Sequence, residues 1–158
     1  MSLGYDARTV VDGVTLDVPT GQVTVVVGPN GCGKSTLLRG LGRLLKPRGG
    51  SVLLDGEAIT SLPTREVAKR LGLLPQQPIV PEGVSVLELV ERGRHPHHGL
   101  FRSWGRADEE AVASALVRTD LVHLAAVPVD SHSAGQRQRA WLAMVLDQAT
   151  PVLPLDEP

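Results

Sequence analysis

The chain has 158 residues, a length that suits one domain with a substantial hydrophobic core. A net charge of −1 and an aromatic content of 3% argue against nucleic acid as a partner, through either charge attraction or base stacking. The single cysteine excludes an internal disulfide framework and suits a reducing compartment. No signal-peptide pattern or membrane-spanning apolar run is present in the sequence. We therefore expect a soluble protein that reaches a membrane only through a partner.

Strand-forming residues alternate with turn residues over the first part of the chain. Residues 10–18 and 22–27 are predicted strands, and residues 19–21 form the predicted turn between them. A helix follows and extends to about Leu45, because the proline and glycines of residues 46–50 end it.

A glycine-rich turn lies between the second strand and this helix. It fits the P-loop template, and its residues are Gly28, Pro29, Asn30, Gly31, Cys32, Gly33, Lys34, Ser35 and Thr36. Glycines let successive backbone N–H groups point at phosphate oxygens, and the helix N-terminus adds the positive end of its dipole. The template places the Lys34 ammonium on the β- and γ-phosphates and the Ser35 hydroxyl on Mg²⁺. The alternative is a turn that binds nothing, which the strand-turn-helix context disfavours.

The middle of the chain changes from strand-like to helical patterning. Residues 51–56 predict a short strand and turn, residues 64–71 a short helix, and residues 72–75 a buried strand. The residue pattern from Gln76 to about Val129 is typical of helices.

Two helices are specified within this helical part. Ser85 and Glu88 form a predicted capping box, and residues 107–118 have acidic residues in their first turn and an apolar face. Residues 93–103 between them are expected to be irregular.

The last part of the chain predicts a helix and then a strand. Ser133 is a good N-cap for a helix that reaches about Gln148, and the apolar run over residues 140–146 predicts deep burial. Residues 151–158 predict a strand ending in Asp156 and Glu157. Beside a P-loop, Asp156 is a candidate Mg²⁺ ligand and Glu157 a candidate to polarise an attacking water. The alternative is a pair of solvated acids at a strand end.

In order and spacing, these motifs resemble the ATP-binding-cassette (ABC) ATPases over essentially the whole chain. The resemblance implies an α/β fold, a P-loop NTPase (RecA-like) core with an inserted α-helical subdomain and without the C-terminal part of the core. It divides the chain into a core with the P-loop (1–75), a helical subdomain (76–130), and the signature helix with the Walker B strand (131–158).

The resemblance also implies roles for residues outside the P-loop. Tyr5 corresponds to an aromatic that stacks on adenine. Gln76, or Gln77 by one register, corresponds to the glutamine that contacts Mg²⁺ and water and couples to a membrane partner. Together with the P-loop this gives catalytic residues Glu157, Gln76 and Lys34, and metal ligands Ser35, Gln76 and Asp156.

Residues 133–139 resemble the family signature and its basic continuation. Ser133, Gly135 and Gln136 are implied to bind the γ-phosphate of ATP held by another protomer, so hydrolysis would require a homodimer or a second ABC protomer. Arg137 and Arg139 are expected to lie on a solvated helix face.

Residues 93–97 and 135–141 resemble the ATPases of ferric-siderophore importers, with vitamin B12 and haem importers as close relatives. The implied partners are integral membrane permease subunits and, indirectly, a periplasmic or extracytoplasmic substrate-binding protein. The implied location is cytoplasmic, peripheral on the inner face of the cell membrane. His95, His97 and His98 also allow a metal-binding reading, but an exposed docking loop is the expectation.

Three departures from the family pattern bear on activity. The signature has His132 and Ala134 in place of leucine and glycine, Pro154 lies inside a predicted central strand, and the sequence stops at Pro158. We therefore keep a second hypothesis, a truncated and non-catalytic nucleotide-binding fragment. A small kinase or GTPase is a third, but residues 133–139 have no role there.

Overall fold

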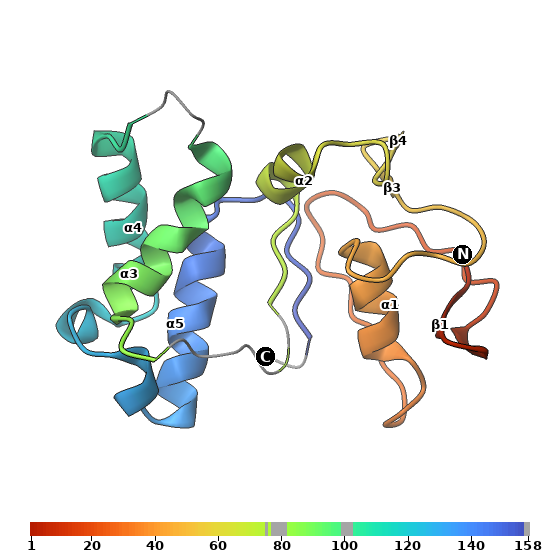
Figure 1. The fold of residues 1–158 in the computed structure, drawn as a ribbon, viewed down its shortest axis with the longest axis horizontal. Helices are drawn as coiled ribbons and strands as arrows, with labels where there is room; N and C mark the ends of the chain where they lie inside the picture. The colour runs from red at the N-terminus through yellow and green to blue at the C-terminus, as the bar shows by residue number, and fades with distance from the viewer. Residues whose placement is uncertain (75, 77–81, 99–102, 157–158) are drawn as a thin grey trace. The chain divides into compact units, whose positions relative to one another are not determined.

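The computed structural model describes residues 1–74, 76, 82–98 and 103–156 (Figure 1). The chain divides into two compact units, Met1–Pro63 and Thr64–Pro158. The division into core, helical subdomain and signature helix remains a prediction. Within the described residues, no helix is both long enough and apolar enough to span a membrane.

The first unit contains two short antiparallel hairpins and one helix. Strands β1 (Leu3–Tyr5) and β2 (Arg8–Val11) pair with each other, as do β3 (Leu53–Leu54) and β4 (Glu57–Ala58), and helix α1 spans Lys34–Leu41.

The core of this unit lies where α1 packs on the first hairpin. Leu3, Val11 and Leu37 are buried together, and Val26 packs against them. A Cβ at Gly40 would come within 2.4 Å of the Leu3 Cδ1 atom, so only glycine lets α1 approach β1 this closely.

Several predicted boundaries in this unit are wrong. The strand predicted over 10–18 ends at Val11, and the predicted helix ends at Leu41 because Arg43 adopts a φ of 61°. Residues 22–27 form no strand within the described part of the chain, because the hairpin strands of this unit pair only with each other.

The second unit is mainly helical. Its helices are α2 (Thr64–Arg70), α3 (Val86–Glu91), α4 (Arg106–Arg118) and α5 (Ala134–Asp147), with 3-10 turns η1 (Arg92–His97), η2 (Val122–Leu124) and η3 (Val129–Ser131). Figure 1 shows α3 and α4 beside α5, and these three helices bury one apolar core between them. The deep burial predicted for residues 140–146 is confirmed for Ala140, Ala143 and Val145, while the other four residues are half-buried.

Local signals set the helix ends as the sequence predicts. Ser85 accepts a hydrogen bond from the Glu88 N–H, and the Glu88 carboxylate accepts one from the Ser85 N–H, so the predicted capping box is present. The expectation of irregular structure over 93–103 is wrong in its first part, because η1 covers Arg92–His97; residues 99–102 lie outside the described part.

Strands are predicted over 72–75 and 151–158, of which residues 75, 157 and 158 lie outside the described part. The described residues form isolated parallel bridges instead, Leu71 with Val152 and Leu74 with Leu155. The physical reason is Pro154. In this parallel register the N–H of residue 154 would donate to the Gly72 carbonyl, and proline has none. The ladder is therefore interrupted between the two bridges.

Candidate functional site

The P-loop joins the extended residues 22–27 to the N-terminus of α1. Gly31 and Gly33 have φ values of 80° and 102°, a region that side-chain-bearing residues rarely adopt, so the turn depends on glycine at both positions. The Lys34 ammonium donates hydrogen bonds to the carbonyls of Gly28 (3.0 Å) and Pro29 (3.2 Å). The loop thus wraps around one cation at the start of the helix.

The N-terminus of α1 has the properties of an anion site. Its N-cap is Gly33, which offers no side-chain cap, and Ser35 and Thr36 occupy the first turn. The N–H groups of a first helical turn lack intrahelical acceptors, and the helix dipole is positive there. Lys34, Ser35 and Thr36 thus lie in the first turn, as the P-loop template expects, while their contacts with phosphate and Mg²⁺ stay a prediction.

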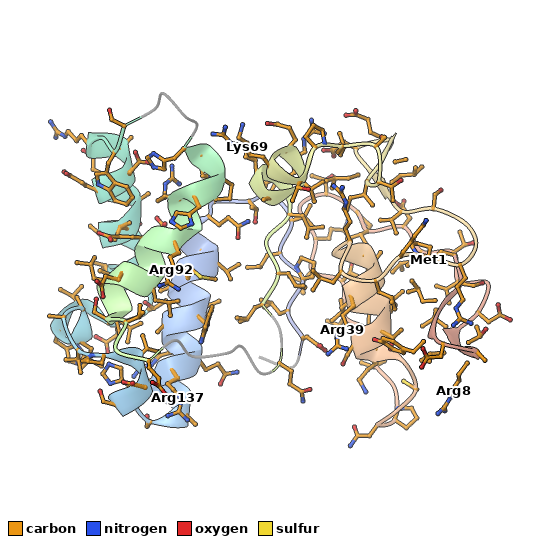
Figure 2. All side chains as sticks on the ribbon, viewed as in Figure 1. Met1, Arg8, Arg39, Lys69, Arg92 and Arg137 are labelled. Carbon is orange, nitrogen blue, oxygen red and sulfur yellow. The ribbon has the colours of Figure 1, made fainter. Side chains whose placement is uncertain are left out.

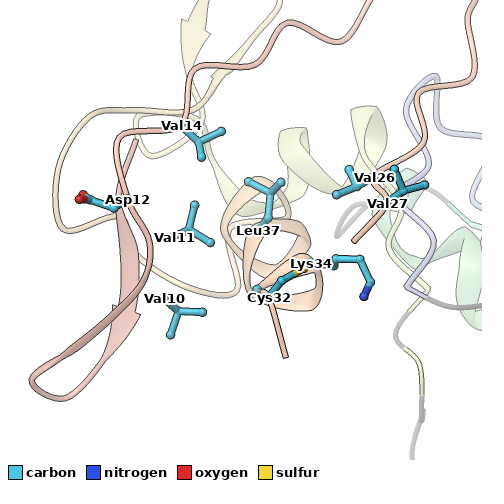
Figure 3. A pocket seen from close by; sticks show the side chains of 10 residues that line it. Val10, Val11, Asp12, Val14, Val26, Val27, Cys32, Lys34 and Leu37 are labelled. Atoms are coloured by element: carbon cyan, nitrogen blue, oxygen red, sulfur yellow. The ribbon is translucent and has the colours of Figure 1, made fainter. Parts of the chain in front are cut away.

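A cavity of about 210 Å³ adjoins the P-loop (Figure 3). The apolar side chains of Val10, Val11 and Val26 line it together with Cys32 and Lys34. The sequence did not indicate Val10 and Val11 as cavity residues, because their pattern predicts only a strand. A Cβ on Gly33 would lie 3.1 Å from Val10 Cγ1, so β2 packs directly on the P-loop turn.

Tyr5 lies on β1 with its side chain 41% exposed. Its hydroxyl accepts a hydrogen bond from Arg39 Nη1 at 3.2 Å. This bond, with a smaller contribution from Thr36, lowers the pKa of the Tyr5 hydroxyl below its ordinary value. The structure thus places Tyr5 in the same unit as the P-loop, while its stacking on adenine stays a prediction.

Gln76 and Asp156 both lie in the second unit, near the ends of two paired segments. Each follows one of the two parallel segments joined by the bridges, and the Asp156 N–H donates to the Leu74 carbonyl at 3.0 Å. Carboxyl ends of adjacent parallel segments meet at one edge. Asp156 is 6% exposed and Gln76 is exposed. The predicted Glu157, and the alternative Gln77, lie outside the described residues.

The signature segment opens α5 in the predicted way. Ser133 is the N-cap and accepts from the Gln136 N–H at 3.3 Å, while Gln136 Oε1 accepts from the Ser133 N–H at 3.0 Å. Ala134 begins the helix, and its φ is not positive, so the alanine in place of glycine causes no backbone strain. A Cβ on Gly135 would meet no atom within 4 Å, so nothing described in this chain requires a glycine there.

His132 is buried, with 8% exposure, and its Nε2 has no hydrogen-bond partner among the described residues. Its carbonyl accepts a hydrogen bond from Arg137 Nη1, so one of the two signature arginines contacts its own chain. The other, Arg139, lies 3.6 Å from the exposed Asp120 carboxylate. Both arginines therefore have intramolecular contacts near the signature segment.

The histidines of the η1 region do not converge. His95 is exposed, His97 Nε2 lies 2.8 Å from the Gln148 carbonyl oxygen, and His98 Nε2 lies 3.3 Å from Asp108 Oδ1. In the part of the chain that the structure describes, no three His, Cys, Asp or Glu side chains form a metal-binding group. The metal-binding reading thus gains no support there. The expectation of an exposed loop holds for His95 but not for Gly93 and Arg94, which are buried.

The order of these parts along the chain, from P-loop to signature helix, is that of a P-loop NTPase of the ABC class. The family model described as ABC transporter matches residues 11–158, and the chain belongs to this family.

Three sequence relatives are named as ATP-binding proteins of transport or import systems. The chain is 56% identical to the "Probable siderophore transport system ATP-binding protein YusV" of Bacillus subtilis and 52% identical to the "Ferric enterobactin transport ATP-binding protein FepC" of Escherichia coli; each match covers 100% of this chain and 58% of the relative. It is 42% identical to the cobalamin import ATP-binding protein BtuD of Halobacterium salinarum, over 94% of this chain and 37% of that one. The chain thus spans little more than half the length of the curated relatives it matches.

Solved structures agree on the fold. An ATP-binding subunit of an ABC transporter matches with a TM-score of 0.84 at 24% identity, covering 98% of this chain and 62% of that one. The cbiO1 protein of Clostridium perfringens, part of the ABC transporter complex cbiONQ, matches with a TM-score of 0.77 at 30% identity, covering 99% of this chain and 63% of that one. The predicted fold class is therefore confirmed.

Proposed function

We propose that this chain is the ATP-binding and ATP-hydrolysing subunit that powers a membrane importer of ferric siderophores or related metal chelates. The observation that carries the proposal is the P-loop, in which Lys34 begins α1 and donates to the Gly28 and Pro29 carbonyls; the first-turn N–H groups and the helix dipole there suit a phosphate. The names of the relatives suggest the substrate class, with cobalamin as the alternative.

The cavity beside the P-loop supports a nucleoside as the rest of the ligand. Its wall from β2 is apolar, as suits a base and ribose, while the phosphates would extend over the α1 N-terminus. Asp156 and Gln76 fit a hydrated Mg²⁺, because a carboxylate and an amide oxygen are hard ligands at one edge of the second unit. When bound, Mg²⁺ would supply charge neutralisation at the phosphates.

The chemistry assigned to this chain is positioning and charge stabilisation. Lys34 neutralises charge on the transferred phosphoryl group, and Glu157 polarises the attacking water. Ser133, Gly135 and Gln136 bind the γ-phosphate held by a second protomer, and the open space around Gly135 suits such an approach. In this proposal the chain acts on the inner face of the membrane with permease subunits and, indirectly, with a substrate-binding protein.

The experiment is calorimetric titration of the purified chain with Mg-ATP. Lys34→Ala should abolish binding, while Lys46→Ala, an exposed lysine of the same unit, should bind like the parent chain. A parent chain that does not bind Mg-ATP would refute the proposal.

Hydrolysis separates the two hypotheses that share nucleotide binding. The ATPase reading expects phosphate release that Glu157→Gln reduces by at least about 100-fold, as loss of a water-positioning group should. If the parent chain binds Mg-ATP but releases no more phosphate than the Glu157→Gln variant, the non-catalytic fragment is supported instead.

A further inference from the structure

A buried ionic cluster connects η1, α4 and α5 and includes none of the candidate site residues. Arg94 is 8% exposed, and its Nε donates to Asp108 Oδ1 at 3.0 Å. Its Nη1 donates to the backbone carbonyl of Asp147 at 2.9 Å. One guanidinium therefore joins the start of α4 to the last residue of α5.

Asp108 takes part in the cluster as an ionised carboxylate. It is 1% exposed, and its Oδ2 accepts from the Gly105 N–H at 3.1 Å, at the N-cap of α4. Burial alone would raise the pKa of Asp108, but the hydrogen bonds from Arg94 and Gly105, with His98 nearby, lower it overall. The Arg94–Asp108 pair is thus a charged and desolvated contact.

The last turn of α5 lies directly on η1. A Cβ on Gly93 would come within 2.3 Å of the Met144 carbonyl oxygen and 2.9 Å of Asp147 Oδ2, so glycine is required for this approach. His97 Nε2 adds a contact of 2.8 Å to the Gln148 carbonyl oxygen. Backbone contact and polar contacts therefore hold the two elements in one register.

The same end of α5 is connected to α2. Gln148 Nε2 donates to the Ala68 carbonyl at 2.6 Å, and Arg65 Nε donates to the Pro96 carbonyl at 2.8 Å. Helix α2 leads into the segment that ends at Gln76. A change in the position of η1 can therefore be transmitted through these hydrogen bonds to α5 and, through α2, to the segment that contains Gln76.

We propose that Arg94 is a positioning residue that fixes η1 to the C-terminal end of α5 and so sets where Ser133, at the other end of this helix, is presented. The proposal rests on the proposed function for the role of Ser133. Buried ion pairs add little net stability but hold a fixed geometry, and a guanidinium can donate in two directions at once. Displacement of η1 would therefore move α5 as a rigid rod about 20 Å long, at 1.5 Å per residue.

The test is a distance distribution between η1 and the start of α5, measured by pulsed electron paramagnetic resonance. Cys32, the only cysteine, is replaced by serine, and spin labels are attached through His95→Cys and Ala134→Cys, both at exposed positions. The parent chain should give one narrow distribution. Arg94→Gln should at least double its width. Arg92→Gln, at the exposed neighbouring arginine labelled in Figure 2, should leave it unchanged.

Two further variants separate positioning from stability. Arg94→Lys keeps the charge, but its single ammonium nitrogen cannot replace both Nε, which meets Asp108, and Nη1, which meets Asp147, so its melting temperature should stay close to that of the parent while the distribution broadens. Arg94→Gln combined with Asp108→Asn removes both buried charges, so the melting temperature should recover while the distribution stays broad. A distribution that stays narrow in both of these variants would overturn the proposal. Mg-ATP titration of the same samples tests the proposed function separately.

Discussion

Asp147 is the residue whose ionisation the fold perturbs most clearly. It is 1% exposed, and its carboxylate oxygens have no hydrogen-bond partner among the described residues. Burial raises the pKa of Asp147 to about 7, with Asp108 and Glu91 adding to the rise and Arg94 opposing it. The folded chain therefore favours the protonated carboxyl, in contrast to the unfolded chain.

This shift predicts a specific pH dependence of stability. Because the folded-state pKa is raised, the stabilising contribution is complete below the unfolded value of 3.8 and is lost as the pH rises through about 7. Asp147→Asn cannot ionise, so at pH 8 it should be more stable than the parent by up to about 4 kcal/mol, with little advantage at pH 4. Urea unfolding at the two pH values measures this. Asp120→Asn, on the surface, is the control, and an equal effect of Asp147→Asn at both pH values would contradict the shift.

Cys32 predicts a chemical route to inhibition. The Cys32 sulfur lies against Gly28, where an added Cβ would come within 2.8 Å of it. Any group attached to the sulfur must therefore occupy space in the P-loop turn. Modification of this exposed thiol with N-ethylmaleimide should therefore abolish Mg-ATP binding, and Cys32→Ser should bind Mg-ATP and resist the reagent. Mass spectrometry establishes complete modification, and calorimetry gives the affinity. An unchanged affinity in the fully modified chain would rule the effect out.

At the scale of the element, the two capping boxes allow a matched comparison. Ser133 and Ser85 make the same reciprocal contacts at the starts of α5 and α3. Replacing either serine by alanine should cost about 1 kcal/mol of stability, as measured by urea unfolding.

Only the Ser133 variant should also affect catalysis. If the signature segment binds the γ-phosphate, Ser133→Ala should slow hydrolysis by at least about tenfold, whereas Ser85→Ala should leave the rate within about twofold. Phosphate release at saturating Mg-ATP is the measurement. Equal rates in the two variants would mean that the Ser133 hydroxyl acts only as a cap.

Elements set by local chemistry were predictable from the sequence, and those set by distant partners were not. The caps at Ser85 and Ser133 depend on residues only three positions away, so the local sequence was enough to predict them, and both predictions are confirmed. The strand expected over 22–27 requires a neighbouring strand that the local pattern cannot supply. The Arg94 cluster escaped notice because it joins residues up to 53 positions apart, which no periodicity reveals.

At the scale of the whole molecule, the main consequence of this missing pairing is exposed apolar surface. Val23, Val25 and Val27 are 92%, 71% and 84% exposed, although strand-forming residues of this kind normally cover a core. Alternate residues of an extended chain point to opposite sides, and Val26 packs on the core of the first unit. Val23, Val25 and Val27 therefore form an exposed apolar patch on the first unit.

This apolar patch predicts dye binding by the 158-residue chain. The fluorescence of 8-anilinonaphthalene-1-sulfonate should rise on addition of the folded chain, and Val23→Thr with Val25→Thr should reduce the rise to roughly half, because threonine keeps the shape but adds a hydroxyl. The melting temperature should not fall, since both side chains are exposed. Val26→Thr is the control from the same segment. It should lower the melting temperature without reducing dye binding, because its side chain packs against Leu3, Val11 and Leu37. Equal dye binding by the parent and the double variant would place the dye on another surface.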